Sequence, residues 1–190
     1  MGNSLRAFVK NYLSYIDNGH LFRKPFSWLY GLLAIINLAF PVYIGYQAWS
    51  FGLLRLVARD RVVFVLVWII VAIVSWLSFQ LWWDRKTKVT TTSTEGDEFV
   101  ATPVFSHLIQ TLGEWLGTWL AIVGFTVALF TLILGDDTGV LWVIGLGFIE
   151  ADASYIVLWP VYGFLIIVVT RFLAEQFRAL SSIANNTRKN

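Results

Sequence analysis

The carboxylates that flank the apolar segments are the residues of this chain whose type and position could do chemistry. Glu114 stands between Gly113 and Gly117, directly before an apolar run. A carboxylate inside a membrane is unfavourable by at least ~2.5 kcal/mol at mid-bilayer, so it is a candidate for ion handling. Because Glu114 lies at the end of its run, where water is near, an ion pair with a basic neighbour is the alternative.

Glu150 and Asp152 form a second acidic candidate, directly before the last apolar run. With Asp136 and Asp137 they could gather at one mouth of a membrane bundle and attract cations. Charges of a solvated loop give the same pattern, so that alternative stays open. Glu114, Glu150 and Asp152 are therefore the candidate ion-path residues.

Catalytic and metal-binding motifs are absent from the sequence. His20 and His107 are the only histidines, and they lack the i, i+3 or i+4 pairing of helix-borne metal ligands. The chain has no cysteine, which excludes thiolate metal sites, disulfides and thiol catalysis. It has neither a serine elbow nor a phosphate-binding loop. We therefore predict no catalytic residue, no cofactor, no metal, and a protein that is not an enzyme.

Small residues recur at spacings of three or four around and beyond Glu114, and they predict a helix-packing face. Lipid gives no hydrophobic drive for helix association, so small residues that let backbones approach closely mark such faces. The packing could lie within the chain or between copies, and glycine and alanine are also common in membrane helices without this role. The predicted helix-packing residues are Gly113, Gly117, Ala121, Gly124 and Ala128.

These candidates stand in a chain with the composition of a membrane protein. Of its 190 residues, 57% are hydrophobic and 14% are charged, whereas a soluble domain carries about 25% charged residues. Residues 62–83 contain no charge and would cover about 30 Å as a helix, enough to cross the hydrocarbon core. The net charge of +2 is too small to suggest nucleic acid as a partner.

We predict an all-α membrane protein with four transmembrane helices, at about 26–46, 62–83, within 108–134, and at 154–170. Asn37, the strongly polar residue in the middle of the first span, is expected to bond to a neighbouring helix. The Thr- and Val-rich stretch 84–104 predicts an extended loop or β-hairpin.

The N-terminal segment predicts an amphipathic helix that lies in the membrane interface or packs on the chain's own spans. Its apolar positions are Leu5, Phe8, Val9, Tyr12, Leu13 and Ile16. The predicted organisation is an interfacial segment at 1–24, a transmembrane hairpin at 25–83, a cytoplasmic loop at 84–107, a second transmembrane hairpin at 108–172, and a polar helical tail at 173–190.

The distribution of basic residues predicts the orientation. With the N-terminus inside, one face would hold only Arg55, Arg59 and Arg61. The other face would hold Arg6, Lys10, Arg23, Lys24, Arg85, Lys86, Lys88, Arg171, Arg178, Arg188 and Lys189. The positive-inside rule then favours cytoplasmic termini. We expect Asp60 to pair with one arginine of the smaller group and the others to reach lipid phosphates.

Two stretches carry a resemblance. VVTRFLAEQFRALSSIANN at 168–186, with Arg171 and Glu175 one helical turn apart, is similar to the ends of small uncharacterised bacterial multi-pass proteins. LFRKPFSWLYGLLAIINL at 21–38 resembles the same group. The resemblance implies an integral protein of the bacterial inner membrane and no particular activity.

The sequence predicts function only as a class. The first expectation is a non-enzymatic accessory or scaffold subunit of a membrane complex or homo-oligomer, whose partners are the lipid bilayer and other membrane chains or copies of itself. The small-residue face, the amphipathic ends and the lack of catalytic motifs favour it. The alternative is a small ion channel or transport component with acidic pore-mouth residues, which the carboxylates favour.

Overall fold

The structure, a computed structural model, describes residues 7, 9–13, 20–91, 101–134, 149 and 152–188. This described part is helical throughout its regular elements and contains no strand. Four of its helical rods are long and apolar enough to cross a membrane, which confirms the predicted class of an all-α chain with four apolar spans. They are α2 (His20–Ser50), α3 (Ala58–Val89), the continuous rod of α4 (Ala101–Trp119), η2 (Leu120–Gly124) and α5 (Phe125–Leu134), and α7 (Tyr155–Arg188).

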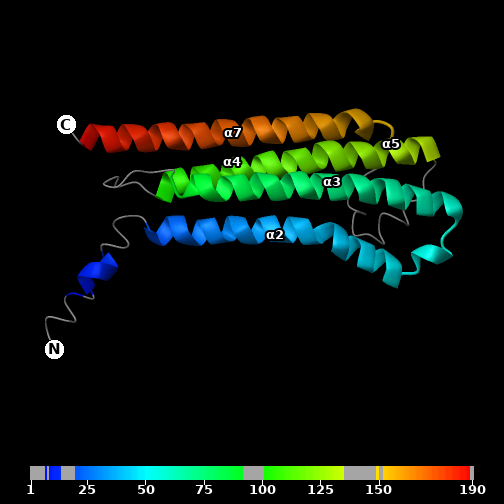
Figure 1. Ribbon diagram of the computed structural model, residues 1–190. Coiled ribbons are helices and arrows are strands. Elements are labelled where there is room, and N and C mark those ends of the chain that lie inside the picture. Colours follow the sequence, from blue (N-terminus) through cyan, green and yellow to red (C-terminus); the bar gives the residue numbers. More distant parts are fainter. Residues whose placement is uncertain are drawn as a thin grey trace.

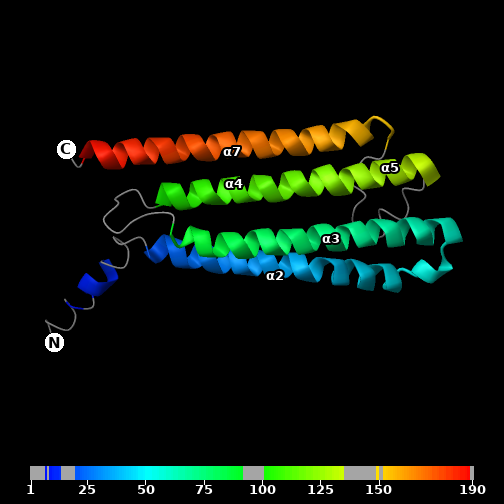
Figure 2. The ribbon, with the colours of Figure 1, turned by 45° about the horizontal axis from the view of Figure 1, so that its top comes forward.

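The rods lie side by side as an elongated bundle (Figure 1). Two pairs dominate the packing, α2 with α3 and α4 with α7. The α4 rod lies between α7 and the α2–α3 pair (Figure 2). Within this rod η2 is one π-helical turn, a type of insertion that is common near functional positions in helices.

Two clusters of buried apolar side chains form the core. One lies toward the α2–α3 connector and is built from Ile44, Phe64, Val67, Val71, Val74, Val123 and Val127 with their neighbours. The other, toward the start of α2, contains Tyr30, Ala34, Trp82, Val89 and Val104. The outward faces of all four rods carry exposed large apolar side chains, as expected of helices solvated by lipid rather than water.

The prediction of an extended loop or β-hairpin over 84–104 is wrong for the part of that segment that the structure describes. α3 continues to Val89 and α4 begins at Ala101. The intervening residues 92–100 lie outside the described part, so the predicted hairpin turn is not tested there.

Tertiary packing explains why these ends are helical. Val89 and Val104, whose β-propensity favoured strands, are both fully buried in the core cluster around Tyr30. An i, i+4 ion pair between Lys88 Nζ and Asp84 Oδ2, at 2.6 Å, supports the last turns of α3. The β-propensity of these valines is weak compared with the effect of their burial, so the packing decides that both ends are helical.

The two flanking segments are helical where they are described. Ala7 and residues 9–13 are helical, with Val9, Tyr12 and Leu13 exposed. At the other end α7 runs without interruption to Arg188, through the segment predicted as a helical tail.

Candidate functional site

Polar side chains from all four rods meet in the half of the bundle that holds the start of α2 and the end of α7. We call this set the polar cluster; its members are Tyr30, Arg85, His107, Gln110, Thr111, Glu114 and Arg178. Four of them come from one face of α4 at positions i, i+3, i+4 and i+7, which the helix repeat brings together. α4 therefore contributes most of the residues of the cluster.

Glu114 is ion-paired in the structure. Its Oε2 accepts a hydrogen bond from Arg85 Nη2 of α3 at 2.9 Å, and its Oε1 accepts one from Gln110 Nε2 at 2.7 Å. The side chains of Arg85 and Glu114 are 22% and 16% exposed, so the pair is partly shielded from water. Of the two predicted roles for Glu114, the geometry matches the partner of a basic neighbour.

The cluster extends from Glu114 to α7. Gln110 Oε1 accepts a hydrogen bond from Arg178 Nη2 at 2.9 Å, and Arg178 Nε donates to the carbonyl oxygen of Ala174 at 3.2 Å. The hydroxyl of Ser106 donates to the same carbonyl at 2.6 Å. A continuous chain of hydrogen bonds thus ties α3, α4 and α7 together.

A second branch of the cluster ties α2 to α4. The hydroxyl of Tyr30 lies 2.9 Å from His107 Nδ1 and 3.5 Å from the hydroxyl oxygen of Thr111. Tyr30 has no exposed surface, and its ring meets Trp82 edge-on with centroids 5.0 Å apart. Tyr30 therefore connects α2 to the cluster through a buried polar contact with His107, beside the ring of Trp82.

Tryptophan N–H groups bridge the helices deeper in the bundle. Trp115 Nε1 donates to Asn37 Oδ1 at 2.9 Å, which confirms the prediction that Asn37 bonds to a neighbouring helix. Trp119 Nε1 donates to the hydroxyl of Ser78, also at 2.9 Å, and Trp68 Nε1 donates to the carbonyl oxygen of Pro41 at the same distance. Each bond joins a different pair of rods.

The predicted small-residue face packs against α7 of the same chain. A β-carbon on Gly117 would lie 2.5 Å from the carbonyl oxygen of Gly163, and one on Gly124 would lie 2.5 Å from Trp159 Cγ. Gly113 packs as closely against Thr170. The α4–η2 rod and α7 thus approach so closely at these three glycines that no side chain fits without a shift.

Ala121 also belongs to this interface, because a β-carbon on Gly163 would lie 2.7 Å from Ala121 Cβ. Ala128, the last of the predicted small residues, is fully buried. Gly163 was not predicted, although a glycine in the middle of an apolar span facing a small-residue stripe is a usable signal. The sequence also contains a signal for the polar members that were not predicted. This signal is a polar stripe at helical spacing, formed by His107, Gln110, Thr111 and Glu114.

Glu114 and Asp152, the candidate ion-path residues that the structure describes, do not come together. Asp152 is exposed, and its Oδ1 accepts a long 3.4 Å contact from the backbone N–H of Ser154. Gly113 packs on Thr170, which lies about 22 Å along α7 from the helix start near Asp152. Glu114 and Asp152 therefore do not share a site, and Glu150, Asp136 and Asp137 lie outside the described residues.

The hydrogen bonds of the polar cluster link the helices. Both carboxylate oxygens of Glu114 and the amide of Gln110 are engaged by protein partners. Within the described ranges no three His, Asp or Glu side chains are grouped as a metal site. Comparison with known proteins gives no match to this chain, whether among family models, curated proteins or solved structures.

Proposed function

We propose that this chain is a non-enzymatic accessory or scaffold subunit of a membrane protein complex or homo-oligomer. A single observation carries the proposal, an exposed apolar face on α7 beyond the charged residue Arg171. The apolar side chains on this part of α7 are Phe172, Leu173, Phe177, Leu180 and Ile183.

This face lies outside the apolar part of α7. The helix continues for about 25 Å from Arg171 to Arg188. Over this length the side toward α4 holds Ala174 and Arg178, which contact Ser106 and Gln110.

Leu173, Phe177 and Leu180, at i, i+4 and i+7, form a separate stripe, and Leu180 is 63% exposed. An apolar stripe beyond the charged end of a span suits a protein partner that binds an amphipathic helix in a groove.

We further propose that this end of the bundle is cytoplasmic and that the membrane is a bacterial inner membrane. The orientation is supported by the positive-inside rule. The described basic residues at this end include Arg23, Lys24, Arg85, Lys86, Lys88, Arg171, Arg178 and Arg188, against Arg55, Arg59 and Arg61 at the connector end. The membrane assignment rests on the resemblance of residues 21–38 and 168–186 to bacterial multi-pass proteins.

Native mass spectrometry of the protein purified in mild detergent from its own membrane tests the proposal. We expect a complex, either with other chains or among copies. Leu180→Glu should release the lone chain, because a carboxylate would be buried in the contact. Ser182→Glu, which adds the same charge at another exposed position of α7, should leave the complex intact. A wild-type protein that is monomeric in mild detergent would contradict the proposal.

The alternative function, an ion channel or transport component, is not favoured by the residues that the structure describes. Glu114 is held by Arg85 and Gln110. Asp152 lies at the opposite end of the bundle. We therefore retain only the accessory or scaffold function as the proposal.

A further inference from the structure

Three arginines stand in and directly after the connector between α2 and α3, and they differ in their partners. Arg59 Nε lies 3.4 Å from Asp60 Oδ1, so the predicted pairing of Asp60 with one connector arginine is confirmed. Arg55 and Arg61 are exposed, and neither makes a hydrogen bond or ion pair through its side chain within the described part of the chain. Two guanidinium groups at this end of the bundle thus remain available to a ligand.

Arg61 is one of five residues that line a shallow apolar groove on one face of α3. The groove has a volume of about 390 Å³ and is lined by Ala58, Arg61, Val62, Val65 and Leu66. Val62, Val65 and Leu66 are exposed on the outward face of the helix, the face that a bilayer would cover. Arg61 is the only charged group in the lining, and it directly precedes the uncharged stretch 62–83.

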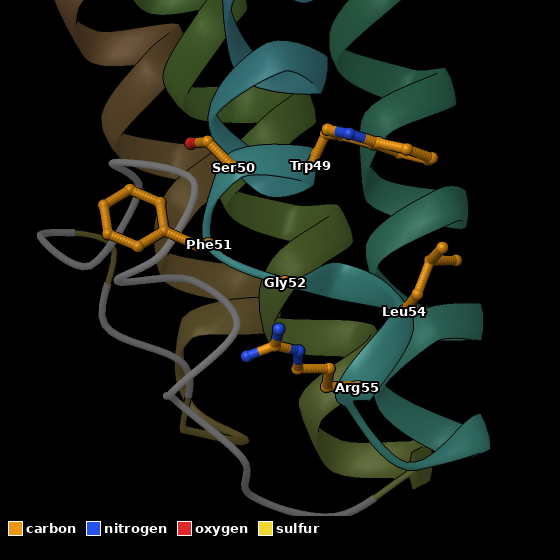
Figure 3. Close-up of a pocket in the computed structure, with 6 residues that line it drawn as sticks. All are labelled: Trp49, Ser50, Phe51, Gly52, Leu54 and Arg55. Atoms are coloured by element: carbon orange, nitrogen blue, oxygen red, sulfur yellow. The ribbon is translucent and has the colours of Figure 1, made fainter.

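The connector beside this groove has the side chains of a membrane interface. Trp49, Phe51 and Leu54 are each more than 60% exposed. Figure 3 shows them around a second pocket, of about 260 Å³, with the side chain of Arg55 pointing back toward Gly52. Gly52 has a φ of 83°, a left-handed conformation that suits glycine.

Exposed aromatic side chains next to an apolar span mark the depth of the lipid headgroups. The connector therefore places the guanidinium of Arg61 at the level of the phosphates. Its aliphatic stem can lie along the apolar surface while the charged head reaches the polar layer.

We infer that Arg61 and its groove form a binding site for an anionic phospholipid. The guanidinium binds the phosphate by paired charge-assisted hydrogen bonds, a geometry that suits arginine. The first acyl carbons lie on Val62, Val65 and Leu66. A headgroup without its own cation is preferred, because the choline of phosphatidylcholine neutralises its phosphate and would be repelled by Arg61 and Arg55.

The test is native mass spectrometry of the full chain, titrated with phosphatidylglycerol or phosphatidylcholine of identical acyl chains. We expect phosphatidylglycerol to bind more tightly, and Arg61→Gln to weaken its first binding step roughly tenfold. Arg171→Gln removes the same charge from a guanidinium that pairs with Glu175, and it should have little effect. Equal binding of the two lipids, or equal effects of the two variants, would overturn the inference.

Two further experiments distinguish binding of the lipid in the groove from attraction by charge alone. Leu66→Trp should fill the groove and weaken phosphatidylglycerol binding with every arginine in place. Millimolar inorganic phosphate should not displace the bound lipid, since it cannot use the apolar lining. Unchanged lipid binding in Leu66→Trp would show that the groove takes no part in the binding, and displacement by phosphate would show that the site takes a free anion; either result would overturn the inference. Helix content measured by circular dichroism verifies that each variant is folded.

Discussion

The α4–α7 and α2–α3 interfaces both contain glycines, but the glycines do different things. At α4–α7 a β-carbon on Gly117 would come within 2.5 Å of the backbone of Gly163. At α2–α3 a β-carbon on Gly45 would lie 3.6 Å from Trp68 Nε1, and one on Gly31 would lie 3.5 Å from Lys86 Nζ. Those are ordinary van der Waals distances. The glycines therefore mark close helix approach at α4–α7, where they face the backbone of Gly163 or the side chains of Thr170 and Trp159, and not at α2–α3.

The two interfaces also differ in what fills them. The α2–α3 pair packs larger side chains, including Ile44 and Phe64, and adds the indole bond from Trp68 to Pro41. The α4–α7 pair is held by close contact along the glycines and by polar contacts at one end. Lipid supplies no hydrophobic drive between helices, so van der Waals contact and hydrogen bonds have to hold both pairs. Reversible unfolding in mixed micelles measures how each substitution changes the stability of these interfaces.

The largest effect is expected from Gly117→Leu. The new side chain would collide with Gly163 and Ile167, and neither the backbone of α7 nor its packed neighbours can move far. We expect the free energy of unfolding to fall by about 3 kcal/mol or more. Tryptophan fluorescence reports the unfolding. A loss below about 1 kcal/mol would show that the α4–α7 contact is looser than the structure has it.

The link between the two pairs is tested by Glu114→Ala. It leaves Arg85 and the amide of Gln110 without their partner in a partly buried site, so we expect a loss of about 1–3 kcal/mol. Adding Arg85→Met should recover part of it, because no unpaired charge then remains. The control Asp84→Ala removes the exposed pair with Lys88 and should change stability by no more than about 1 kcal/mol. Equal losses in Glu114→Ala and the control would contradict a shielded pair.

A smaller effect is expected where α3 meets α2. Trp68→Phe keeps an aromatic ring but removes the N–H that bonds to the carbonyl of Pro41. Interhelical hydrogen bonds in membranes are worth about 0.6 kcal/mol on average, so we expect a loss of that order. Trp76→Phe, on the outward face with half of its surface exposed, is the matched control and should be neutral. A Trp76→Phe loss as large as that of Trp68→Phe would mean that the bond adds nothing.

The smallest effect, and one of opposite sign, is expected from Gly45→Ala. The methyl group has room beside Trp68, and alanine favours the helix by up to about 1 kcal/mol over glycine. Stability should therefore stay equal or rise slightly, whereas Gly117→Ala should lower it by about 1–3 kcal/mol. Equal changes in stability for Gly45→Ala and Gly117→Ala would show that the two interfaces do not differ in how closely their helices approach.

Several features of the fold and site were predictable from local pattern. The four apolar spans follow from uncharged runs such as 62–83. The expectation that Asn37 bonds to a neighbouring helix follows from the scarcity of polar groups in the first span. The identity of Arg85 as the partner of Glu114 was not predictable, because it depends on which helix faces α4 and at what height. The helical ends at Val89 and Val104 were missed for the same reason, since their burial is supplied by α2.

The sequence by itself determined the number and place of the apolar spans. Whether a segment can cross a bilayer depends on its own length and apolarity, and every backbone group must then be bonded within the helix. Only the tertiary structure decided which glycines touch a neighbour and which charges are paired. These properties belong to two surfaces at once, and the surface opposite Gly117 or Glu114 is not encoded in the residues beside it along the chain.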